Sequence, residues 1–146
     1  MAAVFVITTD GQQALADYAG TFLAWLKTLT LRLYSNNRGT PLTTDHLAAY
    51  TECLWSGYAG QLQNDWTEPG VDGNNNYLFA FPDRTFTQTG TVVTETVWGA
   101  FWTEPVGGKL AMVQSRATGL AMDTVGNECI VHANPGVAIG QLSGAP

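Results

Sequence analysis

The sequence predicts a mainly β protein, an antiparallel β-sandwich of jelly-roll type with one helix near the N-terminus. Two features of the composition favour strands and turns: Thr is frequent, and 16 of the 146 residues are Gly. Candidate strands in the second half of the chain are separated by turn residues, at the roughly 8–12-residue spacing typical of sandwiches and barrels. Apolar residues make up 45% of the chain, which is enough for a packed core.

The length of 146 residues suits one domain, because hydrophobic cores rarely divide below about 250 residues. We therefore expect a single domain over residues 1–146, without internal repeats or linkers. Within it we expect an N-terminal arm at 1–9, a helix at 10–26, a β-sandwich at 28–133 and an irregular, Gly/Pro-rich C-terminal arm at 134–146. The two arms are available to extend onto neighbouring subunits.

The helix at 10–26 is predicted from its cap and its period. Asp10 can cap it, and Gln13 three residues later completes a capping-box pattern. Gly20 weakens the helix by up to about 1 kcal/mol, so packing must support it. Apolar residues spaced near 3.6 form one face, which we expect to pack on the sheet: Leu15, Tyr18, Phe22 and Trp25.

The strands follow. At 28–34, leucines alternate with Thr30, Arg32 and Tyr34, which is typical of a half-buried strand. A turn is expected at 36–39, a short helical turn at 43–50 and a long loop at 64–76. The remaining candidate strands are residues 77–81, 85–89, 92–102, 109–116 and 128–132.

Two of these strands, 77–81 and 97–102, are apolar on both faces. A strand of this kind is covered on both sides, either by its own fold or by a partner. One small domain has difficulty covering both faces of two such strands, so we expect the protein to oligomerise.

Residues 10–61 resemble a group of small structural proteins of tailed-phage virions. The resemblance rests on a capped amphipathic helix, the strand LTLRLYSNN, a loop containing Thr-Pro, and the segment LTTDHLAAYTECLWSGYAGQ, with a looser echo at 97–102. It implies a component of a phage particle, in the head or in the tail. The loop NDWTEPGVDGNNN and the aromatic middle of the chain depart from the family pattern.

The charge excludes some partners. The net charge is −6, and the six basic residues are scattered singly, whereas nucleic-acid sites need clustered Lys and Arg. We expect neither nucleic acid nor an anionic membrane surface as a partner. No apolar run approaches the 18 or so residues of a membrane span, and the N-terminus lacks the charged segment of a signal peptide. Synthesis in the cytoplasm is therefore expected. The resemblance to virion proteins implies that this is a host cytoplasm and that the protein is incorporated into the virion.

No enzyme motif is present: the chain contains no phosphate-binding GxxxxGK[ST], no GxGxxG and no GxSxG. His46 and His132 are the two histidines, and neither has metal-ligand spacing. We therefore predict no catalytic residue and no enzymatic activity. An enzyme would require a pocket in which one of these histidines meets a carboxylate.

We predict no cofactor and no metal. The sharpest polar pattern is Asp72, Asn74 and Asn76, which alternate like the first ligands of a calcium loop, with Asp83 at the twelfth position. The sixth position is Tyr77, where an EF-hand needs Gly, so an Asn-rich connection is favoured.

Cys53 and Cys129 are the two cysteines of the chain. In a chain without an export signal we expect free thiols and no disulfide.

The aromatic residues are the candidate interface residues. They can form the core, anchor a subunit interface or form a sugar-stacking platform, and the first two are favoured. The interface candidates are Trp55, Tyr58, Trp66, Tyr77, Phe79, Trp98, Phe101 and Trp102.

Together these observations lead us to expect a non-enzymatic virion component. The expected role is a capsid decoration or cement protein that binds the phage major coat protein and itself, as a homo-oligomer such as a trimer. Low charge agrees with this role, since charged residues are depleted at the centre of protein interfaces. The alternative is a carbohydrate-binding or adaptor module of a tail fibre or baseplate, with a glycan as partner and a concave exposed row of Trp or Tyr.

Overall fold

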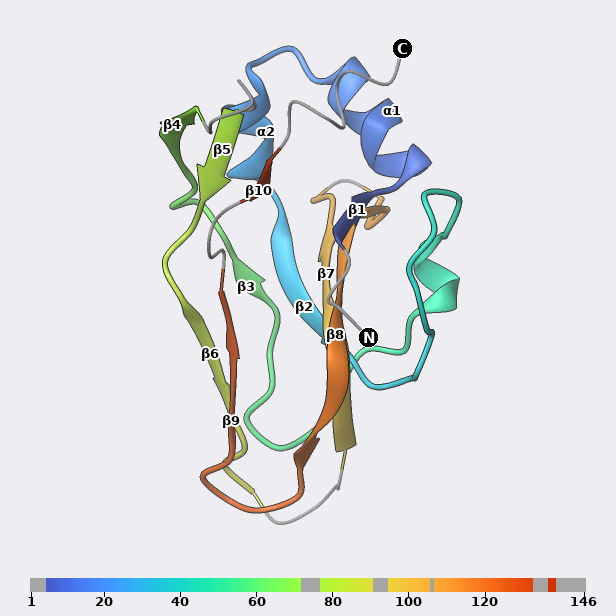
Figure 1. Cartoon of the computed structure of the whole chain (residues 1–146), viewed down its shortest axis with the longest axis vertical. Helices are drawn as coiled ribbons and strands as arrows, with labels where there is room; N and C mark the ends of the chain where they lie inside the picture. Colours follow the sequence, from blue (N-terminus) through green and yellow to red (C-terminus); the bar gives the residue numbers. More distant parts are fainter. Residues whose placement is uncertain (1–4, 72–76, 91–94, 106, 133–136, 139–146) are drawn as a thin grey trace.

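A computed structural model describes residues 5–71, 77–90, 95–105, 107–132 and 137–138, with the backbone alone for 68–71, 77–78 and 137–138. In these residues the protein is mainly β, with antiparallel sheets and two short helices at one end (Figure 1). The helical segments are α1 (Thr9–Asp17), α2 (Phe22–Leu26) and a 3₁₀ turn, η1 (Leu47–Ala49). The strands are β1 (Phe5–Ile7), β2 (Thr30–Tyr34), β3 (Gln61–Leu62), β4 (Thr67–Val71), β5 (Tyr77–Ala80), β6 (Arg84–Thr87), β7 (Glu95–Thr103), β8 (Leu110–Met122), β9 (Glu128–Val131) and β10 (Val137–Ala138).

The largest sheet has the order β1-β8-β7-β2-β3. Its centre is formed by β7, which pairs with β2 from Thr30 opposite Thr103 to Tyr34 opposite Gly99. The alternating Leu pattern of β2 fits this position, because Leu31 and Leu33 are fully buried while Thr30 and Arg32 are partly exposed. The strand predicted at 28–34 is therefore confirmed.

Two smaller sheets complete the described strands, with the orders β10-β5-β4 and β6-β9. The pair β6–β9 lies across from the large sheet, on the left of Figure 1. The sheets remain open at their edges: β1 and β3, the two edge strands of the large sheet, span three and two residues. Short edge strands offer little template for pairing with another chain.

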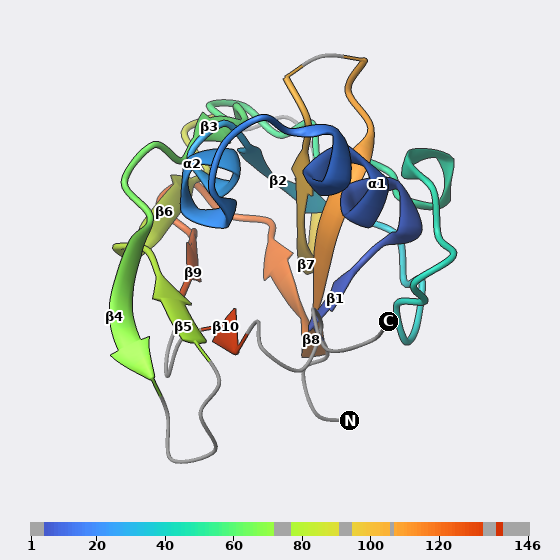
Figure 2. The ribbon, with the colours of Figure 1, turned by 90° about the horizontal axis from the view of Figure 1, so that it is seen from above.

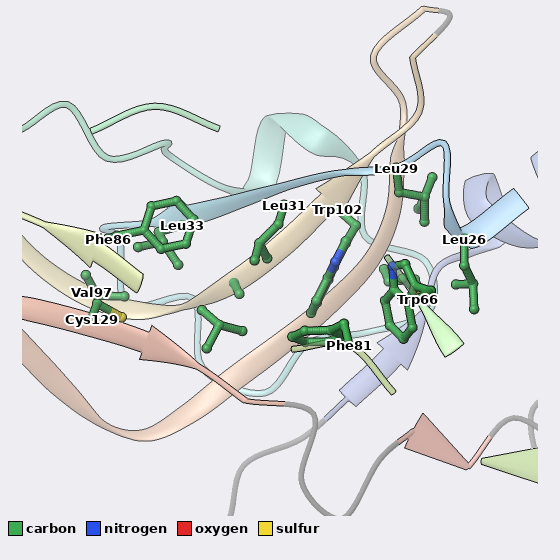
Figure 3. Close-up of a cluster of buried hydrophobic side chains, with 14 of the residues drawn as sticks. Leu26, Leu29, Leu31, Leu33, Trp66, Phe81, Phe86, Val97, Trp102 and Cys129 are labelled. Carbon is green, nitrogen blue, oxygen red and sulfur yellow. The ribbon is translucent and has the colours of Figure 1, made fainter. Parts of the chain in front are cut away.

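One hydrophobic cluster joins all three sheets. Leu31 and Leu33 of β2 and Trp102 of β7 contribute from the large sheet, while Phe86 and Cys129 contribute from β6 and β9. Figure 3 shows these side chains pointing toward one another between the ribbons. The core therefore depends on contacts between strands that are far apart in the sequence.

The prediction of an N-terminal arm at 1–9 is wrong for Phe5–Ile7. Phe5–Ile7 forms β1, which pairs with β8 from Phe5 opposite Gln114 to Ile7 opposite Met112. Ile7 is 3% exposed, so the apolar residues that resembled a flexible arm are part of the core. In the expected C-terminal arm, Val137–Ala138 pairs with β5.

The helix predicted at 10–26 is divided in two. Thr8, and not Asp10, caps α1: its hydroxyl accepts a hydrogen bond from the Gly11 amide at 3.0 Å. Thr21 caps α2 in the same way, accepting from the Ala24 amide at 3.1 Å. A capping Thr takes an extended backbone, as Thr21 does, so the helix restarts there instead of continuing through Gly20. Both helices cover one end of the large sheet, as seen from above in Figure 2.

The loop expected at 64–76 contains a strand. Thr67–Val71 forms β4, at the edge of its sheet, and its register against β5 shifts between Thr67 and Gly70. Pro69 lies inside this shift and has no amide hydrogen for the ladder, which restricts such a strand to an edge. A Pro-Gly pair that indicates a loop in the sequence is thus compatible with an irregular edge strand.

Among the described residues, the helices are too short or too polar to cross a membrane.

Candidate functional site

The aromatic interface candidates lie mostly inside the protein. Trp98 and Tyr58 are partly buried, and of Tyr77 only the backbone, in β5, is described. The others are between 0% and 5% exposed: Trp55, Trp66, Phe79, Phe101 and Trp102. These five side chains are therefore not available on the surface of the single chain.

The buried aromatic rings contact one another, and the indole nitrogens of Trp55 and Trp102 have internal hydrogen-bond partners. Trp66 and Phe81 pack edge to face, with ring centroids 4.7 Å apart, and both rings lie near Trp102. The indole nitrogen of Trp102 donates to the side-chain oxygen of Gln63 at 2.5 Å, and that of Trp55 donates to the Thr87 carbonyl at 3.1 Å. Such rings serve as core anchors and not as a sugar-stacking platform.

Strand β7 is apolar on both faces and is covered on both by this chain. On one face, Val97, Ala100 and Trp102 join the cluster between the sheets. On the other face, Phe101 packs with a second cluster that includes Tyr34 and Tyr50. Gly99 permits this second packing, because a Cβ there would collide with the Tyr34 ring and the Gln114 carbonyl. Of the two alternatives for 97–102, cover by its own fold or by a partner, the first is the one observed.

Among the described residues, the large apolar side chains that are at least half exposed are aliphatic. They lie outside the strand-rich core: Leu54 is 77% exposed, Val125 55%, Leu62 53% and Leu42 50%. Leu62 belongs to the edge strand β3, and Val125 to the turn between β8 and β9. The sequence pattern does not distinguish these residues from buried leucines. They are exposed because they lie at turns and at the edge of a sheet, which only the fold shows.

Within the described residues, three arginines are paired with carboxylates of the same chain. Arg84 contacts Asp65 at 2.7 Å. Arg32 contacts Glu52 at 2.8 Å, and Arg38 contacts the buried carboxylate of Asp45 at 2.5 Å. These contacts neutralise three of the six cations, so little positive charge remains for recognising an anionic polymer.

Both histidines meet a carboxylate. The Nδ1 atom of His46 lies 2.7 Å from Asp10, and the Nδ1 atom of His132 lies 2.8 Å from Asp83. The His46 side chain is 70% exposed, at the surface between α1 and the 40–46 segment. The His132 side chain is about half exposed and lines the mouth of a cavity. His132 is therefore the one of the two that meets the geometric requirement for a site.

The cavity lies between β8 and β9 and has a volume of about 320 Å³. Its floor consists of buried apolar residues, among them Leu33, Val97 and Cys129 (Figure 3). At its mouth β8 bulges: between the pairs Val97–Leu120 and Gly99–Ser115, Trp98 alone faces residues 116–119. Bulges of this kind redirect side chains next to functional sites.

Ser115 lines the same region but does not complete a Ser-His-Asp arrangement with His132 and Asp83. It pairs with Gly99, and cross-strand partners share a face of the sheet. The Cβ of a residue at Gly99 would point at Tyr34, whereas the cavity lies on the face of Leu33. The Ser115 side chain therefore points away from the Leu33 face of the sheet, although the residue borders the cavity.

Cys53 and Cys129 are free, buried thiols. Burial raises the pKa of both groups; Glu95 and Cys129 raise that of Cys53 further, while Arg116 partly opposes the shift at Cys129. Thiols with a raised pKa are poor nucleophiles and poor metal ligands at neutral pH.

The calcium-like pattern at 72–76 lies outside the described residues, and of its expected ligands Asp83 is described, in contact with His132. Among the side chains that are described, no group of three or more His, Cys, Asp or Glu could hold a metal ion.

Comparison of the chain with protein-family models, with curated proteins and with solved structures finds no match.

Proposed function

We propose that the protein is a non-enzymatic structural component of a phage virion, a decoration or cement protein that binds the lattice of the major coat protein. The observation that carries the proposal is the exposure of four aliphatic side chains in separate segments, with Leu54, Leu62, Leu42 and Val125 each at least half exposed. Each of these side chains would gain free energy if a partner surface removed it from water. The resemblance of residues 10–61 to tailed-phage structural proteins directs the proposal to the virion.

The charges support attachment by burial. The chain is only 12% charged, and Arg32, Arg38 and Arg84 are paired with its own carboxylates. A surface with few unpaired charges gains little from electrostatic attraction and loses little when a static interface removes water. Attachment is then expected to be insensitive to salt.

For the fold we propose a β-sandwich of jelly-roll type. The support is the cluster that unites β2 and β7 with β6 and β9, since side chains from the inner faces of two sheets form the core of a sandwich. A jelly-roll also suits a static particle protein because its two layers expose only short edges, as β1 and β3 are here.

Self-association, for example as a trimer, stays part of the proposal. The support for self-association is the set of exposed aliphatic side chains and not strand β7, which the chain covers itself. The alternative, a glycan-binding module of a tail fibre or baseplate, needs an exposed aromatic row. Among the described aromatic side chains Tyr18 alone is clearly exposed, at 37%, so no observation favours that function.

The test is rebinding of the protein to phage heads from which it has been removed. We expect saturable rebinding that changes less than about threefold between low and high salt, because salt screens exposed charges within about 10 Å at 0.1 M and leaves apolar contacts intact. The double substitution Leu54→Ser and Leu62→Ser should weaken rebinding at least tenfold, since both side chains are exposed and contribute little to the fold of the free chain.

The matched control is Lys27→Gln with Lys109→Gln, which changes two exposed charged residues and should leave rebinding unchanged. Failure to rebind heads at any salt concentration would contradict the proposal. Saturable binding to a surface glycan in the same preparation would support the fibre or baseplate module instead.

A further inference from the structure

The formal charge on the described lining of the cavity between β8 and β9 is positive and comes from Arg116, while Asp83 contacts His132 from outside the lining. The chain carries 12 acidic and 6 basic residues, yet the described lining includes Arg116 and His132 and no Asp or Glu. A concave surface lined by one sign of charge concentrates ligands of the other sign. The lining therefore favours an anion.

Arg116 is available to a ligand. In the described part of the chain no ion pair involves it, in contrast to Arg32, Arg38 and Arg84. Its Nε atom donates to the Thr118 carbonyl within the bulge at 3.2 Å, and both residues line the cavity. Its charge reaches the cavity floor, where it lowers the pKa of Cys129 against the effect of burial. The two terminal nitrogens can bind a carboxylate in a fork.

The inner part of the cavity is apolar. Leu33, Val97 and Cys129 are at most 1% exposed, and Ala100 and Val131 complete the floor. A volume of about 320 Å³ holds roughly ten groups of water size, at about 30 Å³ each. It is also near the lower end of the range for small-molecule sites, about 300–1,000 Å³.

We propose that this cavity binds a small amphipathic monocarboxylate, with its carboxylate on Arg116 and its apolar tail between the two sheets. His132 stands at the same mouth, and because Asp83 engages its Nδ1 atom, its Nε2 atom is the one that a ligand can reach. The proposal is independent of virion attachment, because the cavity lining includes none of the exposed residues proposed for attachment, such as Leu54 and Leu62.

The test is a titration of the folded protein with octanoate, which has ten non-hydrogen atoms, followed by amide NMR shifts. We expect saturable shifts confined to the residues of β8 and β9 that line the cavity. Octanol, which has the tail without the charge, should bind at least tenfold more weakly. Acetate, which has the charge without the tail, should produce no saturable shift.

Arg116→Gln should weaken octanoate binding at least tenfold and leave octanol binding unchanged. Its matched control is Lys109→Gln, which removes the same charge at the start of the same hairpin strand and should leave both affinities within twofold. Equal affinity of the wild type for octanoate and octanol would overturn the proposal without any variant. It would also be overturned by unchanged octanoate affinity in Arg116→Gln, or by the absence of saturation below the micelle concentration.

Discussion

Asp45 is a buried carboxylate, and the hydrogen bonds and the ion pair that it makes favour its charged form. Burial alone would raise its pKa, but the Leu42 amide, the Tyr50 hydroxyl and the Arg38 guanidinium outweigh burial and hold the pKa below its ordinary value. The pKa of Tyr50 is raised, first by burial and then by the hydrogen bond to Asp45 and its charge, while Arg38 acts in the opposite direction. These residues tie the 36–50 segment to the far face of β7, where Tyr50 packs on Phe101.

The first prediction concerns this carboxylate. Because the pKa of Asp45 is lower in the folded protein than in the unfolded chain, its stabilisation is complete above the unfolded value near 4 and is lost as pH falls through the folded pKa. Asp45→Asn should lower the free energy of unfolding at pH 7 by about 1.5–3 kcal/mol and reduce its fall with acid below pH 4. Urea titrations from pH 2.5 to 7 measure both effects. Asp123→Asn, at an exposed turn, is the control; an equal loss in both variants would contradict the prediction.

At the scale of single residues, the sequence could not predict which of the large apolar side chains are buried and which are exposed. Trp102 and Trp66 are core residues because distant segments meet over them. Leu54 and Leu62 are exposed because they lie in a loop and in a two-residue edge strand. Residue type alone favours the reverse assignment, since Tyr and Trp are enriched at interfaces and Leu in cores.

Among the elements, the two helices show how a local cap can divide a segment whose apolar period alone predicts one helix. The apolar period at 10–26 is real, and Trp25 is fully buried, but Tyr18 is 37% exposed because the helix ends before it. Local capping by Thr21 decides the break, and a sequence with two good caps is compatible with one helix or two.

The strands were predictable where alternation or β-branched residues were dense, as in β2 and β7. Strands β1 and β4 were missed because only pairing with distant segments makes them strands.

The second prediction uses the contact of α1 with β8. Gly11 is buried, and a Cβ there would collide with the backbone of Ala111. Helix propensity alone predicts that Gly11→Ala stabilises the protein by up to about 1 kcal/mol. We expect the opposite sign, a loss of about 1–3 kcal/mol, because backbone atoms cannot move aside as a flexible side chain can. Thermal unfolding of Gly11→Ala beside Gln13→Ala, at an exposed position of the same helix, decides between them; stabilisation in both would contradict the packing.

The third prediction ranks the two helices. Phe22 of α2 packs on Trp25 and on Phe79 of the core, with ring centroids 5.6 and 5.0 Å apart. Leu15 of α1 and Phe22 are both partly buried beside the same cluster, but Phe22 has the larger side chain and makes the two ring contacts. Phe22→Ala should therefore cost about 3 kcal/mol or more and Leu15→Ala clearly less. Denaturant titration of the two free variants measures the difference, and a larger loss for Leu15→Ala would show that α1 carries the packing.

For the whole molecule, the shared core implies that the sheets fold together. Phe86 of β6 is 3% exposed and belongs to the same cluster as Leu31 of β2 and Trp102 of β7, although these residues lie on opposite layers in Figure 1. The pair β6–β9 alone is a two-stranded ribbon, which is at best marginally stable in water. Its stability therefore comes from the large sheet.

The fourth prediction is that Phe86→Ala destabilises the entire protein and not only its own ribbon. The substitution should lower the free energy of unfolding by about 3–5 kcal/mol. Trp55 donates to the Thr87 carbonyl of β6, so the measurement uses a Trp55→Phe background, in which the fully buried Trp102 of β7 and Trp66 beside it report on the large sheet through their fluorescence. Far-ultraviolet circular dichroism reports on all strands. If unfolding is cooperative, both signals shift to the same lower urea midpoint with an unchanged slope. A transition seen by circular dichroism before the tryptophan signal changes would mean that β6 and β9 detach while the large sheet stays folded. Thr85→Ala, at an exposed position of the same strand, is the control and should move neither midpoint by more than a few tenths of a kcal/mol.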